Sequence, residues 1–214
     1  MRLISALLLL SAAAASQTPR IMFTKQFPGS KPPYVSVSLT KSGVLEYKEA
    51  VDDQMPVKTH LPETDVARLF DSADKLNHFQ TPLESGAKVA NTGRKTFTYE
   101  DEAGKRFDTT FNYSTNPDAQ QLLERFEEIA ESERAYINLE RTARFDKLGV
   151  NDALAEIEAL WLHKQLAAPL QFVPLLKQIS SHESYMHLVR ERAARLKTAF
   201  ELPSPSAQAG NPKQ

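Results

Sequence analysis

The stretch from Tyr34 to Glu49 constrains the fold most, because it alternates between apolar and polar residues on both sides of a short break. Before the break, Val35, Val37 and Leu39 are separated by serines. After the break, which ends at Gly43, the alternation resumes over 44–47. A period of two residues on each side of a glycine-containing turn predicts a β-hairpin with one buried face.

A second hairpin is predicted over residues 95–113, around a turn at 101–104. Aromatic residues recur at every second position or close to it: Phe97, Tyr99, Phe107, Phe111 and Tyr113. We expect these rings to cover an amphipathic helix that begins at Pro62, a residue type suited to the first helical position. Residues 20–24 predict a weaker strand, and 52–59 an irregular segment that Val57 can extend as a strand.

The second half of the chain predicts helices only. One helix starts after Asn116 and stops at Gly149, and the next starts at Asn151 or Asp152. That second helix carries two apolar stripes and Trp161, which predicts either a helix packed between neighbours or a docking surface. A short helix spans 170–179, and Ser180 with Glu183 has the capping-box spacing of another helix start.

This order of elements predicts an α+β fold: a small antiparallel ββ-α-ββ sheet with a helix on one face, followed by an all-helical part. The domain boundaries expected are 17–131 for the α+β domain and 132–201 for the helical subdomain, with the helix from Pro117 shared by both. Residues 202–214 have the composition of a disordered tail.

Residues 1–16 have the pattern of a secretory signal peptide. Arg2 precedes an apolar run from Leu3 to Leu10, and small residues follow at 11–16. The alternative is an N-terminal membrane anchor, but the run is short for a bilayer span. We therefore expect an exported protein, periplasmic or secreted, with no transmembrane segment after cleavage.

Composition excludes several chemistries. The chain has no cysteine, so disulfides, thiolate nucleophiles and iron–sulfur clusters are ruled out. Its net charge of −1 gives no reason to expect a nucleic acid partner.

Two familiar motifs are approached but not met. His182 and His187 are five residues apart, one too many for the zinc-protease helix motif, and Gly93-Arg94-Lys95-Thr96 does not meet the phosphate-loop pattern. We predict no catalytic residue, metal ligand or cofactor.

The long segment from Phe79 to Arg94 is the best candidate for a functional loop. His78, Phe79, Arg94 and Lys95 stand at its ends, where they can line a cleft at the sheet edge with the loop as a lid. The alternative is a mobile surface loop. The last helix also carries a group of basic residues: Arg190, Arg192, Arg195 and Lys197. Such a group can bind an anionic lipid or an acidic partner, and the alternative is that it only complements the helix dipole.

Residues 21–131 resemble an uncharacterised domain family of exported bacterial proteins. The resemblance rests on the strand from Tyr34, the Gly43-to-Tyr47 strand, the helix from Pro62, the hairpin at 95–113 and the helix from Pro117. Many members carry a cysteine pair before the first of these strands, and residues 27–33 have none here. The resemblance implies an α+β fold and export, and it implies no activity.

Together these features favour a non-catalytic exported module that binds a protein of the cell envelope. Two alternatives remain. One is a small-ligand or metal-binding domain that uses the 79–94 loop. The other is a hydrolase with a dispersed site, which requires a histidine such as His60, His78 or His163 beside a serine and an acid.

Overall fold

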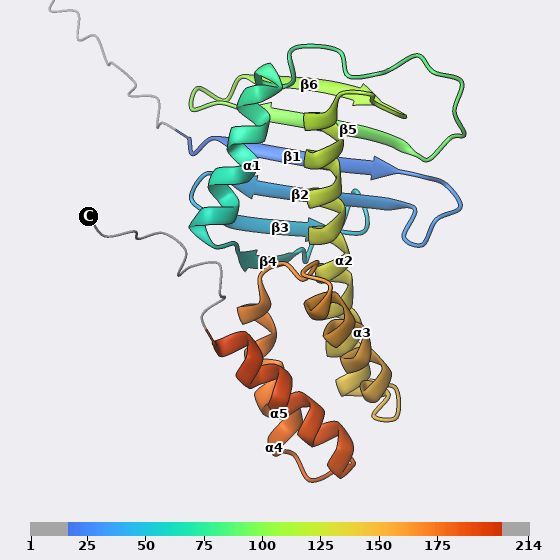
Figure 1. Ribbon diagram of the computed structural model, residues 1–214, viewed down its shortest axis with the longest axis vertical. Helices are drawn as coiled ribbons and strands as arrows, with labels where there is room; N and C mark the ends of the chain where they lie inside the picture. The colour runs from blue at the N-terminus through green and yellow to red at the C-terminus, as the bar shows by residue number, and fades with distance from the viewer. Residues whose placement is uncertain (1–16, 203–214) are drawn as a thin grey trace, which may run out of the picture.

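The structure is a computed structural model, and it describes residues 17–202 (Figure 1). The expected signal peptide at 1–16 and nearly all of the expected tail lie outside the described residues. Within them, a six-stranded antiparallel sheet is followed by a set of helices beyond one edge of the sheet (Figure 1). The α+β prediction is confirmed.

The sheet has the strand order β4-β3-β2-β1-β5-β6. Its strands are β1 (Arg20–Gln26), β2 (Tyr34–Thr40), β3 (Val44–Lys48), β4 (Val57–His60), β5 (Arg94–Glu100) and β6 (Arg106–Phe111). The two predicted hairpins are the pairs β2–β3 and β5–β6. The weakly predicted strand from Arg20 lies between them as β1, at the centre of the sheet.

Gly43 explains why the first hairpin turns where it does. Its φ is +93°, a backbone conformation that residues other than glycine rarely adopt. A Cβ at this position would also lie 2.4 Å from Cε1 of His60. Residues 52–56 are irregular, as expected, and the strand that Val57 was expected to extend is β4, whose residues 57–60 pair with β3 at the edge of the sheet.

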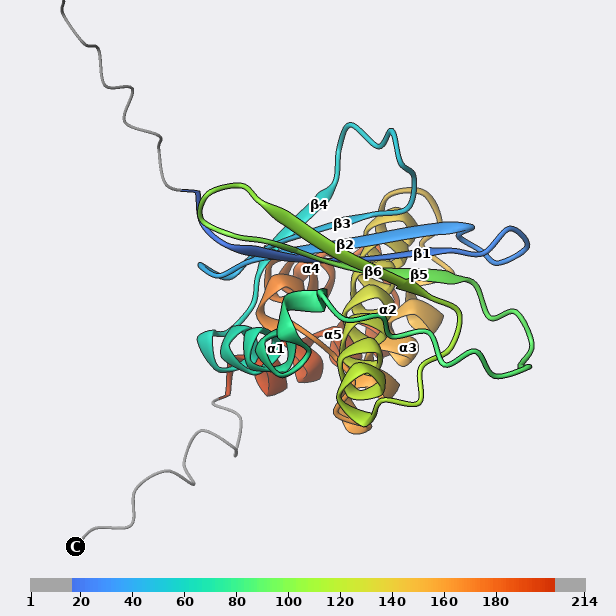
Figure 2. The same ribbon diagram turned by 90° about the horizontal axis from the view of Figure 1, so that it is seen from above.

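Helices α1 (Glu63–Lys75) and the first half of α2 (Pro117–Phe145) lie on the same face of the sheet (Figures 1 and 2). The other face carries no helix of residues 17–202 (Figure 2). Its outward positions include serines and threonines of β1, β2 and β6, as water-facing antiparallel sheets commonly do. The core lies between the sheet and these helices.

Aromatic rings fill this core, but around a different helix from the one expected. Phe97 lies 5.1–5.9 Å, centroid to centroid, from the rings of Phe23, Phe79, Phe111 and Phe126. Phe126 belongs to α2, and Phe79 ends the short 3-10 helix η1 (Asn77–Phe79). The second hairpin therefore packs mainly under α2 and η1 rather than under the helix that follows Pro62.

The second half of α2 extends past the sheet and packs with α3 (Val150–Leu162), the 3-10 helix η2 (Pro169–Phe172), α4 (Val173–Ser181) and α5 (His187–Glu201). Two expectations here are wrong. Ser180 does not start the last helix, because α4 runs to Ser181 and α5 begins only at His187. Helix α3 buries one face only, and Leu162 of its second stripe is exposed.

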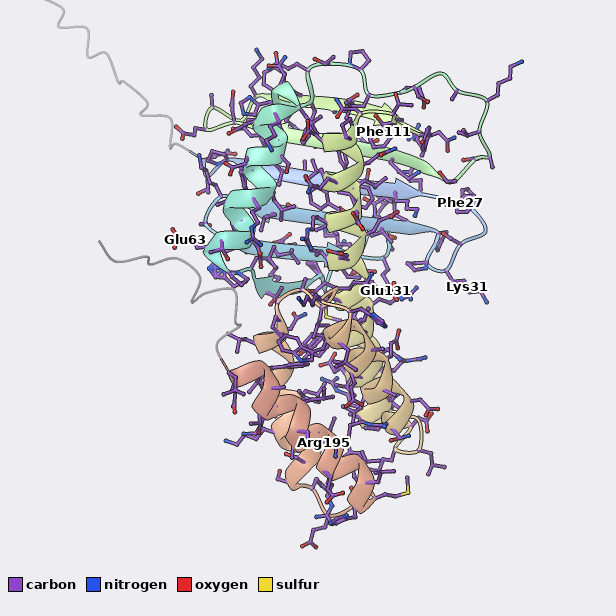
Figure 3. The ribbon with its side chains drawn as sticks, viewed as in Figure 1. Phe27, Lys31, Glu63, Phe111, Glu131 and Arg195 are labelled. Carbon is purple, nitrogen blue, oxygen red and sulfur yellow. The ribbon has the colours of Figure 1, made fainter. Side chains whose placement is uncertain are left out.

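Helix α2 serves both halves of the molecule. Its residues from Ala119 to Ile129 belong to the core under the sheet, and Ala135 and Leu139 belong to the core of the helical part. Glu131 marks the region where α2 leaves the sheet (Figure 3). Close by, the buried Ser132 accepts a hydrogen bond from Ala167 N at 2.8 Å, which attaches the segment after α3 to the middle of α2.

Candidate ligand site

A pocket of about 330 Å³ opens between the first turns of α2 and the adjacent ends of β1, β5 and β6. Phe111, at the end of β6, lies beside the first turns of α2 (Figure 3). The apolar part of the lining comes from Phe111, Ala119 and Leu123. The polar part comes from Lys25, Thr92, Lys95, Asn112, Tyr113, Ser114, Gln120 and Glu127. The volume suits a small molecule or a single side chain.

Two lysines lie side by side in the wall of this pocket. Lys25 on β1 and Lys95 on β5 are directly opposed in the strand register. Lys25 follows Phe23 by two residues, and Lys95 precedes Phe97 by two. Because both phenylalanines point inward, both lysines lie on the covered face of the sheet. Like charges directly opposite each other destabilise a sheet unless something offsets them.

One carboxylate offsets this pair. Glu127 of α2 accepts from Lys25 Nζ at 2.7 Å. Lys95, only 4% exposed, donates instead to three uncharged oxygens: Thr92 Oγ1 at 2.8 Å, Asn112 O at 2.8 Å and Gly93 O at 3.2 Å. Burial, and next the positive charge of Lys25, lowers the pKa of Lys95. The pocket thus holds two ammonium groups and one carboxylate.

The long loop after η1 is attached to the same corner through Asn112. The Asn112 side chain accepts from Thr92 N at 2.9 Å and donates to Ala90 O at 3.1 Å. Its backbone N–H donates to Glu84 Oε2 at 2.6 Å, and this hydrogen bond is the main reason why the pKa of Glu84 is lowered. Ser85 N donates to Tyr113 O at 2.9 Å. Both ends of the loop are therefore held against the end of β6.

The four residues proposed from the sequence are separated by the fold. Lys95 lies in the pocket wall. Arg94 lies on the opposite face of β5 and donates to Gln26 Oε1 at 3.1 Å. Phe79 is buried in the core, and His78 stacks on Tyr99 at 4.1 Å between ring centroids while it contacts Asp74 at 2.7 Å.

Sequence reasoning missed Lys25, Glu127 and Tyr113. A signal was present for the first of these, because the inward positions of β1 read Ile21, Phe23 and then Lys25. A charged residue that continues an inward apolar series marks either the end of the core or a polar site inside it. No such signal pointed to Glu127, since its place beside Lys25 depends on how α2 crosses the sheet.

The histidines do not assemble the set that a dispersed hydrolase site requires. Over the described range 17–202, His78 is paired with Asp74, His182 with Ser184 Oγ at 2.8 Å and His187 with Glu191. No histidine in that range is bonded to both a serine and an acid. The same residues contain no cluster of three potential metal ligands, and none of their helices is both long and apolar enough for a bilayer.

Compared with models of known protein families and with curated proteins, the chain finds no match.

Proposed function

We propose that this chain is a non-catalytic exported binding module, and that the pocket under α2 binds a small anionic ligand. The observation that carries the proposal is the opposed pair Lys25 and Lys95, of which only Lys25 is ion-paired, with the carboxylate of Glu127. Export rests on the signal-peptide pattern of residues 1–16 and on the resemblance to a family of exported proteins.

The charge balance favours an anion over a neutral or cationic ligand. A buried ammonium group is costly unless an opposite charge lies near it. Lys95 donates only to uncharged oxygens, and the charges of Glu127 and Glu84 do not outweigh its burial and the charge of Lys25, so a carboxylate or phosphate group in the pocket would relieve this cost. Tyr113 and Ser114 line the same space, and each carries a hydroxyl group of a kind that can donate to an anion.

Neither a metal site nor a hydrolytic site is favoured by a comparable observation. The proposal includes an envelope protein as partner, with an acidic side chain of that protein as the anion. Whether the ligand is a small molecule or a protein side chain, the pocket would bind one carboxylate or phosphate group beside Leu123 and Phe111.

The test is an amide NMR titration of the chain from Gln17 to Gln214 with inorganic phosphate and with succinate. We expect saturable shifts centred on Thr92, Asn112 and Tyr113 for at least one of the two anions. Replacing Lys25→Gln should weaken binding by roughly tenfold, the effect of losing one charged hydrogen bond.

Lys88→Gln is the matched control, because Lys88 is an exposed lysine on the nearby loop and does not line the pocket. Its affinity for the anions should equal that of the unchanged protein. The proposal fails if neither anion gives a saturable shift, or if the Lys25 and Lys88 variants bind equally well. Deletion of residues 84–91, which removes part of the loop, should also abolish binding if the loop closes the pocket.

A further inference from the structure

Four large apolar side chains are exposed together at the end of the helical part. Phe145 is 82% exposed, Leu148 79%, and Met186 and Leu188 55% each. They belong to the α2–α3 turn and to the start of α5, and we call this set the apolar tip. Single exposed apolar residues are ordinary on a protein surface, but a group of them indicates an interaction site.

Hydrogen bonds hold the two turns of the tip side by side. Tyr185 OH donates to Ala143 O at 2.9 Å, and Lys147 Nζ donates to Ser184 Oγ at 2.9 Å. On the other side, Arg192 donates to Asn151 Oδ1 at 2.7 Å, and Leu188 lies one turn before Arg192 on α5. This hydrogen bond places the first turns of α5 beside the start of α3.

The tip is a projection rather than a groove. It lies at the end of the molecule farthest from the sheet, where the chain makes its two turns (Figure 1). An exposure near four-fifths means that almost nothing packs around Phe145 or Leu148. A projecting apolar group can be buried by insertion into a fluid lipid surface, which adapts its shape to the side chain.

The charges around the tip fit a negatively charged surface. Among the exposed residues of 141–148 and 177–191, four are basic and three are acidic: Arg141, Arg144, Lys147 and Lys177 against Asp146, Glu183 and Glu191. Asp146 accepts from Gly149 N at 3.1 Å, and Arg144 is paired with Glu140 at 2.8 Å. The basic excess includes Lys147, which lies between the two apolar residues of the α2–α3 turn.

We propose that the apolar tip docks on the surface of an anionic lipid bilayer, with Phe145 and Leu148 inserted at the headgroup level and Lys147 at the phosphates. This site is separate from the pocket under α2, and it does not depend on the anion-binding proposal. Docking at this end leaves the pocket, which is lined by the first turns of α2, at the other end of that helix (Figure 1).

Vesicle co-sedimentation tests the proposal. The chain from Gln17 to Gln214 contains every described residue and lacks the apolar run at 1–16, which would bind vesicles by itself. We expect it to sediment with phosphatidylcholine vesicles that contain phosphatidylglycerol, and less so at high salt. Replacing Phe145→Ser and Leu148→Ser together should weaken this binding by roughly tenfold or more. Lys147→Gln should weaken binding to the anionic vesicles only.

The matched control replaces Leu162→Ser and Leu170→Ser, two exposed leucines outside the tip. Its vesicle binding and its melting temperature should equal those of the unchanged chain. The proposal is overturned if the unchanged chain stays in the supernatant, or if tip and control variants bind vesicles equally. It is also overturned if sedimentation velocity shows a lipid-free dimer that the tip variant dissociates, because a second copy would then cover the tip.

Discussion

The carboxyl group of Glu133 on α2 accepts one hydrogen bond, from Gln171 Nε2 on η2 at 3.0 Å. Its other oxygen, Oε2, is buried and has no partner among residues 17–202. Burial therefore raises the pKa of Glu133 to about 7. An acid that is buried where the two halves of the molecule meet makes the stability of the fold depend on pH.

The direction of this dependence follows from the raised pKa. Below about pH 4.5 the carboxyl is protonated in both the folded and unfolded states, so folding carries no penalty. Between that pH and about 7 the unfolded state loses its proton first, and the folded state is progressively destabilised. We expect Glu133→Gln to remove this contribution and to raise the free energy of unfolding at pH 8 by up to about 3 kcal/mol.

Urea denaturation at several pH values measures this effect. Glu124→Gln is the control, because Glu124 is an exposed glutamate on the same helix. If the two variants show the same pH dependence between pH 5 and pH 8, Glu133 does not titrate in this range.

Ser132→Ala should loosen the attachment of the α3–η2 segment to α2. The hydroxyl accepts from Ala167 N, and its loss leaves this backbone group without a partner, at a cost of about 1–3 kcal/mol. Hydrogen exchange at Ala167 should become faster. In Ser72→Ala, the control, the lost hydroxyl donates only to Arg68 O within its own helix, so we expect little change in stability. Equal effects of the two substitutions would contradict the prediction.

Phe97→Ala should be the most damaging of these substitutions. The ring is fully buried and touches four other phenylalanine rings, so its removal should cost about 3–5 kcal/mol. Phe145→Ala, at the exposed tip, should change the free energy of unfolding by about 0.5 kcal/mol or less. Thermal or chemical denaturation distinguishes the two, and a large loss at Phe145 would show that its ring packs in solution.

Gly43→Ala tests the turn of the first hairpin. Gly43 and Gly86 both have positive φ, at +93° and +68°, so a Cβ strains the backbone at either position. Only at Gly43 does the Cβ also meet the His60 ring. We expect a cost of roughly 2 kcal/mol or more at Gly43 and roughly 1 kcal/mol at Gly86. A similar melting temperature for both variants would mean that His60 moves aside.

Local sequence patterns predicted the elements well wherever the pattern was self-contained. The alternation of 34–47 and of the second hairpin gave both strand pairs, and Asn116 with Pro117 gave the start of α2, where Asn116 Oδ1 accepts from Asp118 N at 2.9 Å. The capping-box spacing at Ser180 failed because its serine lies inside the last turn of α4. The edge strand β4 was missed as an element of its own because its four residues are stabilised mainly by pairing with β3.

Only part of the candidate site could be predicted from the sequence. Lys95 was proposed from the sequence because it ends a long loop. Lys25, 70 positions away, became its neighbour only through the pairing of β1 with β5. Glu127 lies beside Lys25 only because α2 crosses the sheet at this point.

The sequence by itself determined the α+β class, the two hairpins and the main helices, because alternation, helical spacing and glycine or proline positions act within a few residues. The tertiary structure alone decided which helix covers the aromatic core, that two lysines oppose each other, that Glu133 is buried and that Phe145 is exposed. Those outcomes depend on contacts between residues far apart in the chain, and burial and charge pairing are properties of those contacts.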